Sequence, residues 1–236
     1  MVWFQETIGW LIKQFNSTFI VKSRYMLFLE GFRNTLIIAL GAVLIGVLIG
    51  VLVAIVRVYR TQTGKLKFLD WLCGVYLAIF RGTPIVVQLM IMYFIVFNSV
   101  KNGVIVAIIT FGINSGAYVS EIVRAGILAV DAGQTEAGRS LGLSARKTMF
   151  LIVLPQAIKN ILPALGNEFI SLLKETSVAG YVSIRDLARA GENVRVNTGE
   201  PYFSLFSVAI VYFLLIFGFT KLLKVFERRL SKGDRG

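Results

Sequence analysis

Long apolar runs, separated by short charged segments, set the pattern of the chain. The uncharged run at residues 34–56 is long enough to cross about 30 Å of hydrocarbon as a helix. Further runs of this kind cover residues 70–98, 104–125, 154–173 and 203–223. We therefore expect an all-α membrane protein with about five transmembrane helices.

Glycine and proline residues occur at particular places in these runs. The second run is interrupted by Arg81-Gly82-Thr83-Pro84, which predicts a broken helix because proline removes a backbone donor. Gly46 and Gly50 lie one turn apart in the first run and permit the close approach of another helix. That helix belongs either to this chain or to a second subunit, and the sequence leaves the choice open.

The N-terminal segment, residues 1–30, differs from the predicted spans. Its residues 3–20 are interrupted by Lys13, so we expect an amphipathic helix that lies in the membrane interface and contacts lipid. Residues 31–225 form one transmembrane domain without an internal repeat, and residues 226–236 form a basic tail.

Basic residues orient the predicted spans. They are Arg57, Arg60, Lys65 and Lys67 after the first span, Arg139, Arg146 and Lys147 after the third, and Lys221, Lys224, Arg228, Arg229, Lys232 and Arg235 around the end of the fifth. Loops rich in Lys and Arg remain in the cytoplasm. This rule places the loop after the third span and the C-terminus in the cytoplasm, and the N-terminus outside.

The composition excludes several classes of protein. Hydrophobic residues make up 56% of the chain and the mean hydropathy is +0.74, which is too apolar for a soluble domain of this length. The net charge of +12 is typical of cytoplasmic membrane loops, so we expect no nucleic-acid partner. The chain has no histidine and only one cysteine, Cys73, which indicates neither a metal site nor a disulfide framework. The N-terminus lacks the pattern of a cleaved signal peptide.

A polar hairpin at about residues 133–155 joins the third and fourth spans. It contains Glu136-Ala137-Gly138, Gly142, Ile152 and Leu154-Pro155. This spacing resembles the EAA loop of importer permeases in the ATP-binding cassette (ABC) superfamily, whose short helices dock on a cytoplasmic ATPase. The resemblance assigns contact with the ATPase to Glu136, Ala137, Gly138, Gly142, Leu143 and Arg146. The family pattern has alanine where this chain has Gly138, which bears on the helicity of the first coupling helix.

The same hairpin comes close to a phosphate-binding loop, G-x-x-x-x-G-K-[ST]. Arg139 replaces the lysine of that pattern, and the segment follows a predicted membrane helix instead of a strand. We therefore expect no cofactor in this chain. By the resemblance, ATP and Mg²⁺ are bound by the partner ATPase.

Three further segments resemble the polar amino acid branch of these permeases. They are Phe80–Pro84 with Gln88-Leu89, Ser115–Tyr118 with Glu121–Gly126, and Asn167-Glu168 with Leu172–Ser177. The resemblance implies the ABC type I importer permease topology in a bacterial inner (cytoplasmic) membrane. It also implies a cytoplasmic ABC ATPase dimer, a second permease subunit forming a homo- or heterodimer, and an extracytoplasmic amino acid binding protein.

Polar residues at membrane depth mark a candidate substrate site. Glu168 lies about 13 residues beyond Pro155, which is roughly 20 Å along a helix. A carboxylate at this depth usually faces a bundle interior or a water-filled path. We expect substrate contacts from Asn167, Glu168, Gln88, Asn114, Tyr118 and Ser171. The other interpretation is that these groups hydrogen-bond neighbouring helices.

Two sets of residues share helix faces with these candidates. Asn160, Asn167, Ser171 and Lys174 form one polar stripe on the fourth span. Arg81, Glu121 and Arg124 are more typical of structural ion pairs near an interface.

The substrate class follows from the acid at membrane depth. A buried carboxylate without a permanent cationic partner favours arginine, lysine or histidine as the substrate, while glutamine and cystine remain open. A proton-coupled secondary transporter is the first rival, but it would not need a large docking hairpin. An intramembrane enzyme is the second, with Ser171 and Lys174 as its only residues at helical spacing. We expect this chain to transport and to catalyse no reaction.

Overall fold

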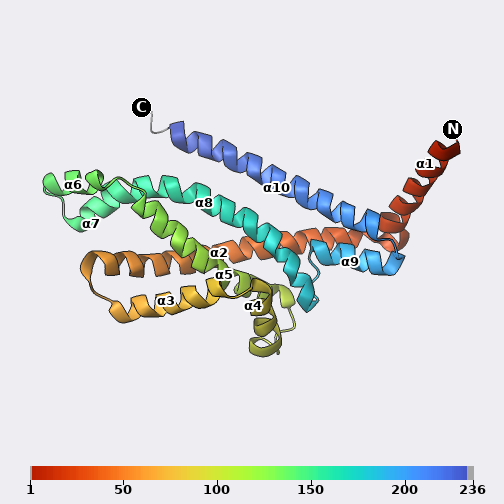
Figure 1. Ribbon diagram of the computed structural model, residues 1–236, viewed down its shortest axis with the longest axis horizontal. Helices are drawn as coiled ribbons and strands as arrows, with labels where there is room; N and C mark the ends of the chain where they lie inside the picture. Colours follow the sequence, from red (N-terminus) through yellow and green to blue (C-terminus); the bar gives the residue numbers. More distant parts are fainter. Residues whose placement is uncertain (1, 233–236) are drawn as a thin grey trace.

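The computed structural model describes residues 2–232, and within that range the chain is built of helices and turns without a strand. The long helices α2, α5, α8 and α10 run along one axis of the molecule, while α1 extends away at one end (Figure 1). The expectation of an all-α membrane fold is confirmed. Residues 233–236 of the predicted basic tail lie outside the described residues.

The elements follow one another in this order. The α-helices are α1 (Val2–Phe15), α2 (Tyr25–Thr63), α3 (Lys67–Gly82), α4 (Ile85–Ile91), α5 (Gly103–Leu128), α6 (Ala132–Ser140), α7 (Ala145–Thr148), α8 (Leu154–Glu175), α9 (Leu187–Thr198) and α10 (Pro201–Lys232). Short π-helical or 3₁₀ segments are η1 (Asn16–Ile20), η2 (Val21–Ser23), η3 (Met92–Val96), η4 (Met149–Val153) and η5 (Thr176–Val182).

The predicted spans agree with the long helices. Four stretches of the described chain are long and apolar enough to cross a membrane: Tyr25–Thr63, Gly103–Leu128, Ala145–Val182 and Pro201–Leu230. Each contains one of the predicted apolar runs. The 39-residue helix α2 extends well beyond the predicted run at residues 34–56, because polar residues at both of its ends still continue the helix.

The second predicted span is broken into two helices. Helix α3 ends at Gly82. The helical stretch Ile85–Val96, which consists of α4 and η3, continues at an angle of 106° to α3. The residues between them, Thr83 and Pro84, have extended backbone. The predicted interruption is therefore confirmed, but residues 70–98 do not form one straight crossing. Proline fixes its own φ and cannot supply the backbone donor that would continue α3.

Helices α2 and α5 pack closely through small residues. An added Cβ at Gly46 would lie 2.8 Å from the Ser115 hydroxyl oxygen. At Gly50 it would lie 2.6 Å from the Val119 side chain and 2.8 Å from the backbone nitrogen of Ser120. The two glycines therefore serve a contact within this chain, which answers the question that the sequence leaves open.

The connection between α8 and α10 is anchored by Asp186. Its carboxylate accepts hydrogen bonds from the backbone N–H groups of Ala188 at 2.9 Å and Arg189 at 3.0 Å, which caps the N-terminus of α9. The Tyr212 hydroxyl of α10 donates to the same carboxylate at 3.3 Å. Burial raises the pKa of the Asp186 carboxyl above its ordinary value, and the hydrogen bonds to α9 oppose that rise. Asp186 thus holds α9 against α10.

Replacing Gly50 by alanine should destabilise the bundle by about 1–3 kcal/mol, because the new methyl group has no space between α2 and α5. Unfolding of the purified protein by titration with SDS measures this loss. Gly218→Ala in α10 is the matched control, since nothing lies within 4 Å of its added Cβ. A variant at residue 50 as stable as the control would contradict the close contact.

Candidate functional site

Glu168 on α8 is held by a side chain of α5. The Ser115 hydroxyl donates a hydrogen bond of 2.7 Å to the Glu168 carboxylate. Ser115 is fully buried where α5 passes Gly46 of α2, whereas Glu168 is half-buried. The carboxylate is therefore fixed at the contact between α5 and α8 and keeps part of its surface open.

A second carboxylate lies on the same face of α8. Glu175 follows Glu168 by two helical turns, is also half-buried, and the two carboxylates repel each other electrostatically. Within the described residues neither acid takes part in an ion pair shorter than 4 Å. Lys174 reduces the negative charge near Glu175 but is itself exposed. This face of α8 therefore carries two carboxylates without a close ion-pair partner among the described residues.

Most of the predicted polar stripe of α8 is exposed at the surface of the chain. Asn160, Asn167 and Lys174 are exposed, and Ser171 is half-buried. The Asn167 amide donates to the backbone oxygen of Pro163 at 3.1 Å, one turn earlier in the helix. The carbonyl oxygen of this amide stays available to a ligand.

Gln88 and Asn114 lie at the break between α3 and α4. The Gln88 amide nitrogen donates to the backbone oxygens of Phe80 at 3.0 Å and Thr83 at 3.1 Å, and to the Thr83 hydroxyl at 2.8 Å. The Asn114 amide nitrogen donates to Phe80 at 2.9 Å and to the Gln88 amide oxygen at 3.0 Å. Both side chains are buried. They satisfy the backbone groups that the broken helix frees, and their predicted contact with substrate stays a prediction.

A network of charges connects α2, α3 and α5. The Glu121 carboxylate pairs with Arg57 at 2.8 Å and with Arg124 at 2.7 Å, as expected for structural ion pairs. Arg57 also lies 3.6 Å from Asp70. The Arg81 guanidinium instead lies over the ring of Tyr118, 5.6 Å from its centroid.

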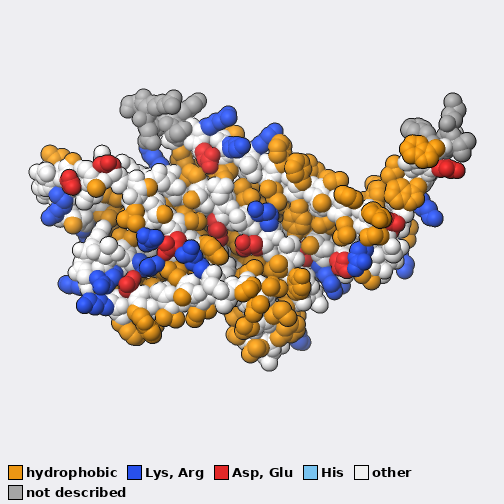
Figure 2. Space-filling model, in the orientation of Figure 1, with side chains coloured by type: hydrophobic (Ala, Val, Ile, Leu, Met, Phe, Trp, Pro, Cys, Tyr) orange, Lys and Arg blue, Asp and Glu red, His pale blue; other side chains and the backbone are white. Residues whose placement is uncertain are grey.

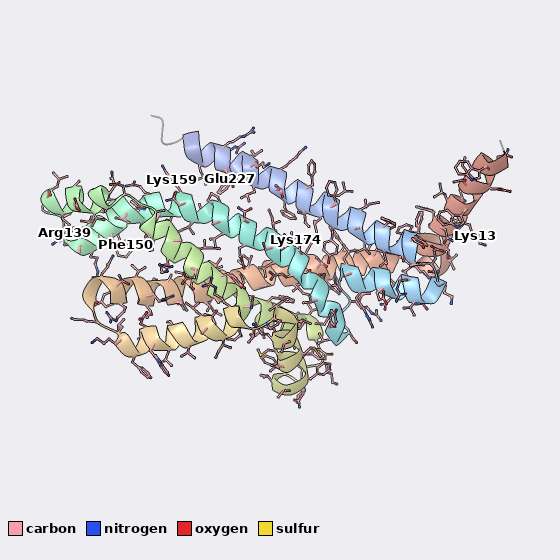
Figure 3. All side chains as sticks on the ribbon, viewed as in Figure 1. Lys13, Arg139, Phe150, Lys159, Lys174 and Glu227 are labelled. Carbon is pink, nitrogen blue, oxygen red and sulfur yellow. The ribbon has the colours of Figure 1, made fainter. Side chains whose placement is uncertain are left out.

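The charges of these helices gather on one visible face of the molecule. Figure 2 shows basic and acidic side chains clustered over α3 and α5, with further acidic side chains beside them toward α8. Lys174 of α8 projects on this same face in Figure 3. Larger apolar areas lie beside these charges, over α4 and α10 (Figure 2).

The hairpin between α5 and α8 folds into two short helices. Asp131 caps α6 by accepting from the Gly133 N–H at 2.7 Å, and Ser144 caps α7 by accepting from the Lys147 N–H at 3.3 Å. Gly142 lies between them with a φ of +81°, in the left-handed region that favours glycine. Leu143 N–H then donates back to the Gly138 oxygen at 3.1 Å, which closes the turn.

Gly138 is where the chain departs from the family pattern, yet α6 remains helical through it. A Cβ at this position would lie 2.7 Å from the Thr148 side chain and 2.8 Å from that of Ile152. The glycine thus permits close packing of α6 on the segment that leads into α8. Glycine at position 138 therefore does not interrupt α6, and it allows the two arms of the hairpin to pack closely.

The outer surface of the hairpin has no partner within the described chain. Glu136, Ala137 and Arg146 are exposed, while Leu143 is half-buried. Large apolar side chains are exposed as well: Leu141 by 81%, Phe150 by 60% and Leu151 by 66%. Figure 3 shows Arg139 and Phe150 at one end of the molecule, with Lys13 of α1 at the other. An exposed apolar surface rimmed by charges is typical of a protein interaction site.

Sequence reasoning missed two residues of this arrangement. Ser115 belongs to a segment that we single out, but its contact with Glu168 depends on how α5 and α8 cross. Glu175 could have been found, because its separation of seven residues from Glu168 places both on one helix face. The sequence pattern does not predict that Gln88 and Asn114 bind each other.

A helical bundle with charged residues at membrane depth and an exposed hairpin at one end is the architecture of a transporter's membrane subunit. The model of the family described as the binding-protein-dependent transport system inner membrane component matches residues 46–232. The chain belongs to this family, and the expected relation to ABC type I importer permeases is confirmed.

Individual relatives agree with this assignment. The chain is 37% identical to the L-cystine transport system permease protein TcyB of Bacillus subtilis, over 72% of this chain and 74% of that protein. It is 38% identical to a putative glutamine transport system permease protein of Rickettsia felis (88% and 94%). Identity to the arginine transport system permease protein ArtQ of Bacillus subtilis is 35% (87% and 93%).

Solved structures share the fold. A crystal structure of an amino acid ABC transporter with histidines superposes with a TM-score of 0.81 at 39% identity, covering 89% of this chain and 98% of that one. The MetNI methionine ABC transporter, in an inward-facing conformation, superposes with a TM-score of 0.75 at 20% identity (87% and 97%), which supports the fold alone.

Replacing Gln88 by leucine should lower the free energy of unfolding by about 1–3 kcal/mol, because buried backbone oxygens at the α3–α4 break lose their donor. SDS titration of the purified protein measures the change. Gln134→Leu on the exposed surface of α6 is the control and should leave stability nearly unchanged. Equal stability of the two variants would show that the amide does not support the break.

Proposed function

We propose that this chain is the membrane permease subunit of an ATP-driven importer of polar amino acids, with a basic amino acid as its substrate. The acids Glu168 and Glu175 carry the proposal. A substrate with a cationic side chain brings two positive groups, its ammonium and its side chain, to two carboxylates that form no ion pair shorter than 4 Å with a described residue.

The names of the relatives support amino acids as the substrate class, but they do not distinguish basic from neutral amino acids. Relatives are named for cystine, glutamine and arginine transport, so amino acids are their common class. The choice among them rests on charge. Glutamine has one ammonium and would leave the second carboxylate unpaired. Cystine has two ammonium groups but also two carboxylates, so it brings no net positive charge to this face. Arginine and lysine do bring one, as does histidine when its imidazole is protonated.

The remaining predicted contacts fit around these acids. Asn167 and Ser171 share the accessible face of α8 and offer donors and acceptors for the α-amino and α-carboxylate groups. Tyr118 is 40% exposed on α5 and supplies an aromatic surface for an aliphatic or cationic side chain. Gln88 and Asn114 act by holding the broken helix, so that its open end stays next to the site.

Coupling to ATP hydrolysis is assigned to the hairpin of α6 and α7. A cytoplasmic ABC ATPase dimer, which binds ATP and Mg²⁺, would contact Glu136 together with the exposed Leu141 and Phe150. The charge distribution supports a cytoplasmic hairpin and C-terminus and an outer N-terminus in the bacterial inner membrane. The same proposal includes an extracytoplasmic binding protein and a second permease subunit.

Transport then follows from two states of the paired subunits. Closure of the ATPases moves the hairpin, and the hairpin is continuous with α5 and α8, the two helices that share Glu168 and Ser115. A shift between these helices changes the site's exposure and its affinity for the substrate. Such a difference in affinity between states is what drives an alternating-access cycle.

Glu168→Gln tests the substrate class. Because the variant removes one negative charge and keeps the shape, uptake of L-arginine by the reconstituted importer should fall by about tenfold, the effect of roughly 1.4 kcal/mol. Uptake of L-glutamine, where measurable, should change less than twofold. Radiolabelled uptake into proteoliposomes with the ATPase and binding protein gives both values.

Equal losses for the basic and the neutral amino acid would argue that Glu168 is structural. Asp131→Asn is the matched control for removing an acid, because it lies on the hairpin far along the chain from α8 and retains an oxygen for the α6 cap. It should leave the arginine-to-glutamine ratio unchanged.

Glu136→Lys tests the coupling role. The charge reversal should abolish stimulation of ATP hydrolysis by substrate while the chain still inserts in the membrane, because Glu136 is exposed and contributes no packing. ATPase assays with and without L-arginine and binding protein measure the coupling. Glu227→Lys, on α10 outside the hairpin, is the control and should retain stimulation. Unchanged stimulation in the Glu136 variant would refute the docking role.

A further inference from the structure

A charged cavity lies between α2, α3 and α5, outside the acid face of α8. It has a volume of about 480 Å³, and its charged lining residues are Arg57, Arg81, Glu121 and Arg124. The remaining lining comes from the small and apolar residues of α3 on its turns from Gly74 to Gly82. The cavity therefore combines guanidinium groups with room for a small molecule.

Positive charge in this cavity exceeds negative charge. Glu121 is shared by Arg57 and Arg124, and Arg57 is further balanced by Asp70 at 3.6 Å. Arg81 takes part in no ion pair shorter than 4 Å with a described residue. Its guanidinium lies 5.6 Å from the centre of the Tyr118 ring, and Glu121 attracts it without forming an ion pair within 4 Å. The Arg81 guanidinium thus has several donors available to an anion.

The position of Arg81 along α3 bears on which anion it binds, the carboxylate of an amino acid or the phosphate of a lipid. Arg81 follows Lys67, the first residue of α3, by about 14 residues, or roughly 21 Å of helix. The cavity also reaches Arg124, one turn before the end of α5 at Leu128, so Arg81 lies farther from the hairpin end of the bundle than Arg124 does (Figure 1). Charged residues at such depth usually face a water-filled route through the protein.

The cavity also adjoins the acid site along α5. Tyr118, which lies under Arg81, follows Ser115 by one helical turn, and Ser115 binds Glu168. A molecule that moves away from Glu168 along α5 therefore meets first Tyr118, with Arg81 of α3 over its ring, and then Arg124 of α5.

We infer that Arg81, with Arg124 beside it, binds the α-carboxylate of the transported amino acid on its route between the acid face and the hairpin end of the bundle. The planar guanidinium can donate two parallel hydrogen bonds to a carboxylate. The inference rests on the proposed function, because it takes an amino acid as the substrate. It adds a position that selects for the free carboxylate, whereas Glu168 and Glu175 select for positive charge.

Arg81→Gln tests this inference in the complete complex with its ATPase, reconstituted in nanodiscs without nucleotide. The probes are L-arginine and L-glutamine, each compared with its α-amide, which lacks the carboxylate charge. The wild type should bind the free acid more tightly than the amide. In the variant, the acid-to-amide affinity ratio should fall by about tenfold, while affinity for the amide changes less than twofold. Scintillation proximity competition measures both affinities.

Two further variants keep the test falsifiable. Arg81→Lys retains the charge without the planar fork and should recover part of the ratio. Arg60→Gln is the matched control, since it lies one turn from Arg57 on α2 and does not line the cavity. It should leave the ratio unchanged. Retention of the ATPase during purification verifies that each variant is assembled.

The possible failures are distinguishable. Wild-type binding of an amino acid with an unchanged ratio in Arg81→Gln would overturn the inference and leave the proposed function standing. A tightly retained phospholipid, seen by native mass spectrometry in the wild type and lost in the variant with no change in the ratio, would assign the cavity to lipid phosphate and also overturn it. A wild type that binds no amino acid would overturn the proposed function itself.

Discussion

The polar side chains of α5 have to find partners inside an apolar bundle, and this requirement positions the other helices. Ser115 donates to Glu168 of α8, Asn114 donates to Gln88 and to the end of α3, and Glu121 binds Arg57 of α2. An unpaired polar group in such surroundings would cost several kcal/mol. Because α5 is the most buried of the candidate spans, each of these contacts is enclosed on several sides. The arrangement of the candidate site therefore follows from the hydrogen bonds and ion pairs that the polar side chains of α5 make.

The same contacts explain how the bundle accommodates charged side chains on its membrane-spanning helices. Glu121 is neutralised by two arginines, so the network between α2 and α5 is nearly balanced. Within the described residues, Glu168 accepts a hydrogen bond from the Ser115 hydroxyl but forms no ion pair shorter than 4 Å, and neither does Arg81, which lies over the Tyr118 ring. These two incompletely balanced groups have opposite signs and lie near neighbouring turns of α5. A zwitterionic molecule with a cationic side chain complements both signs, whereas a purely apolar or anionic solute complements at most one of them.

The coupling role proposed for the hairpin requires its two arms to be packed together. Gly138 allows α6 to pack directly on Thr148 and Ile152, so that the two arms move together. The left-handed turn at Gly142 and the two capped helix ends leave few backbone groups unsatisfied. Its exposed apolar side chains have no cover within the described chain, in agreement with the proposed ATPase partner.

Much of the fold could be predicted from sequence, since apolar length alone identifies membrane helices. The run at residues 104–125 corresponds to α5 at Gly103–Leu128, and the interruption at Pro84 is correct. The bend of 106° could not be predicted, because it depends on Gln88 and Asn114, which come from different helices. Glu168 is identified by its depth, but its donor Ser115 is fixed only by the crossing of α5 and α8. Local patterns thus give the elements, whereas the pairings arise from tertiary contacts.

The central claim is that the accessible face of α8 beside α5 lines the route of a cationic amino acid. Its most direct test places a cysteine at Asn167, which is exposed on this face, in a chain with Cys73 replaced by alanine. A small cationic thiol reagent should label that cysteine in the assembled importer, and L-arginine should protect it. Labelling only by an apolar maleimide, unaffected by any amino acid, would show that this face meets lipid and would contradict the account.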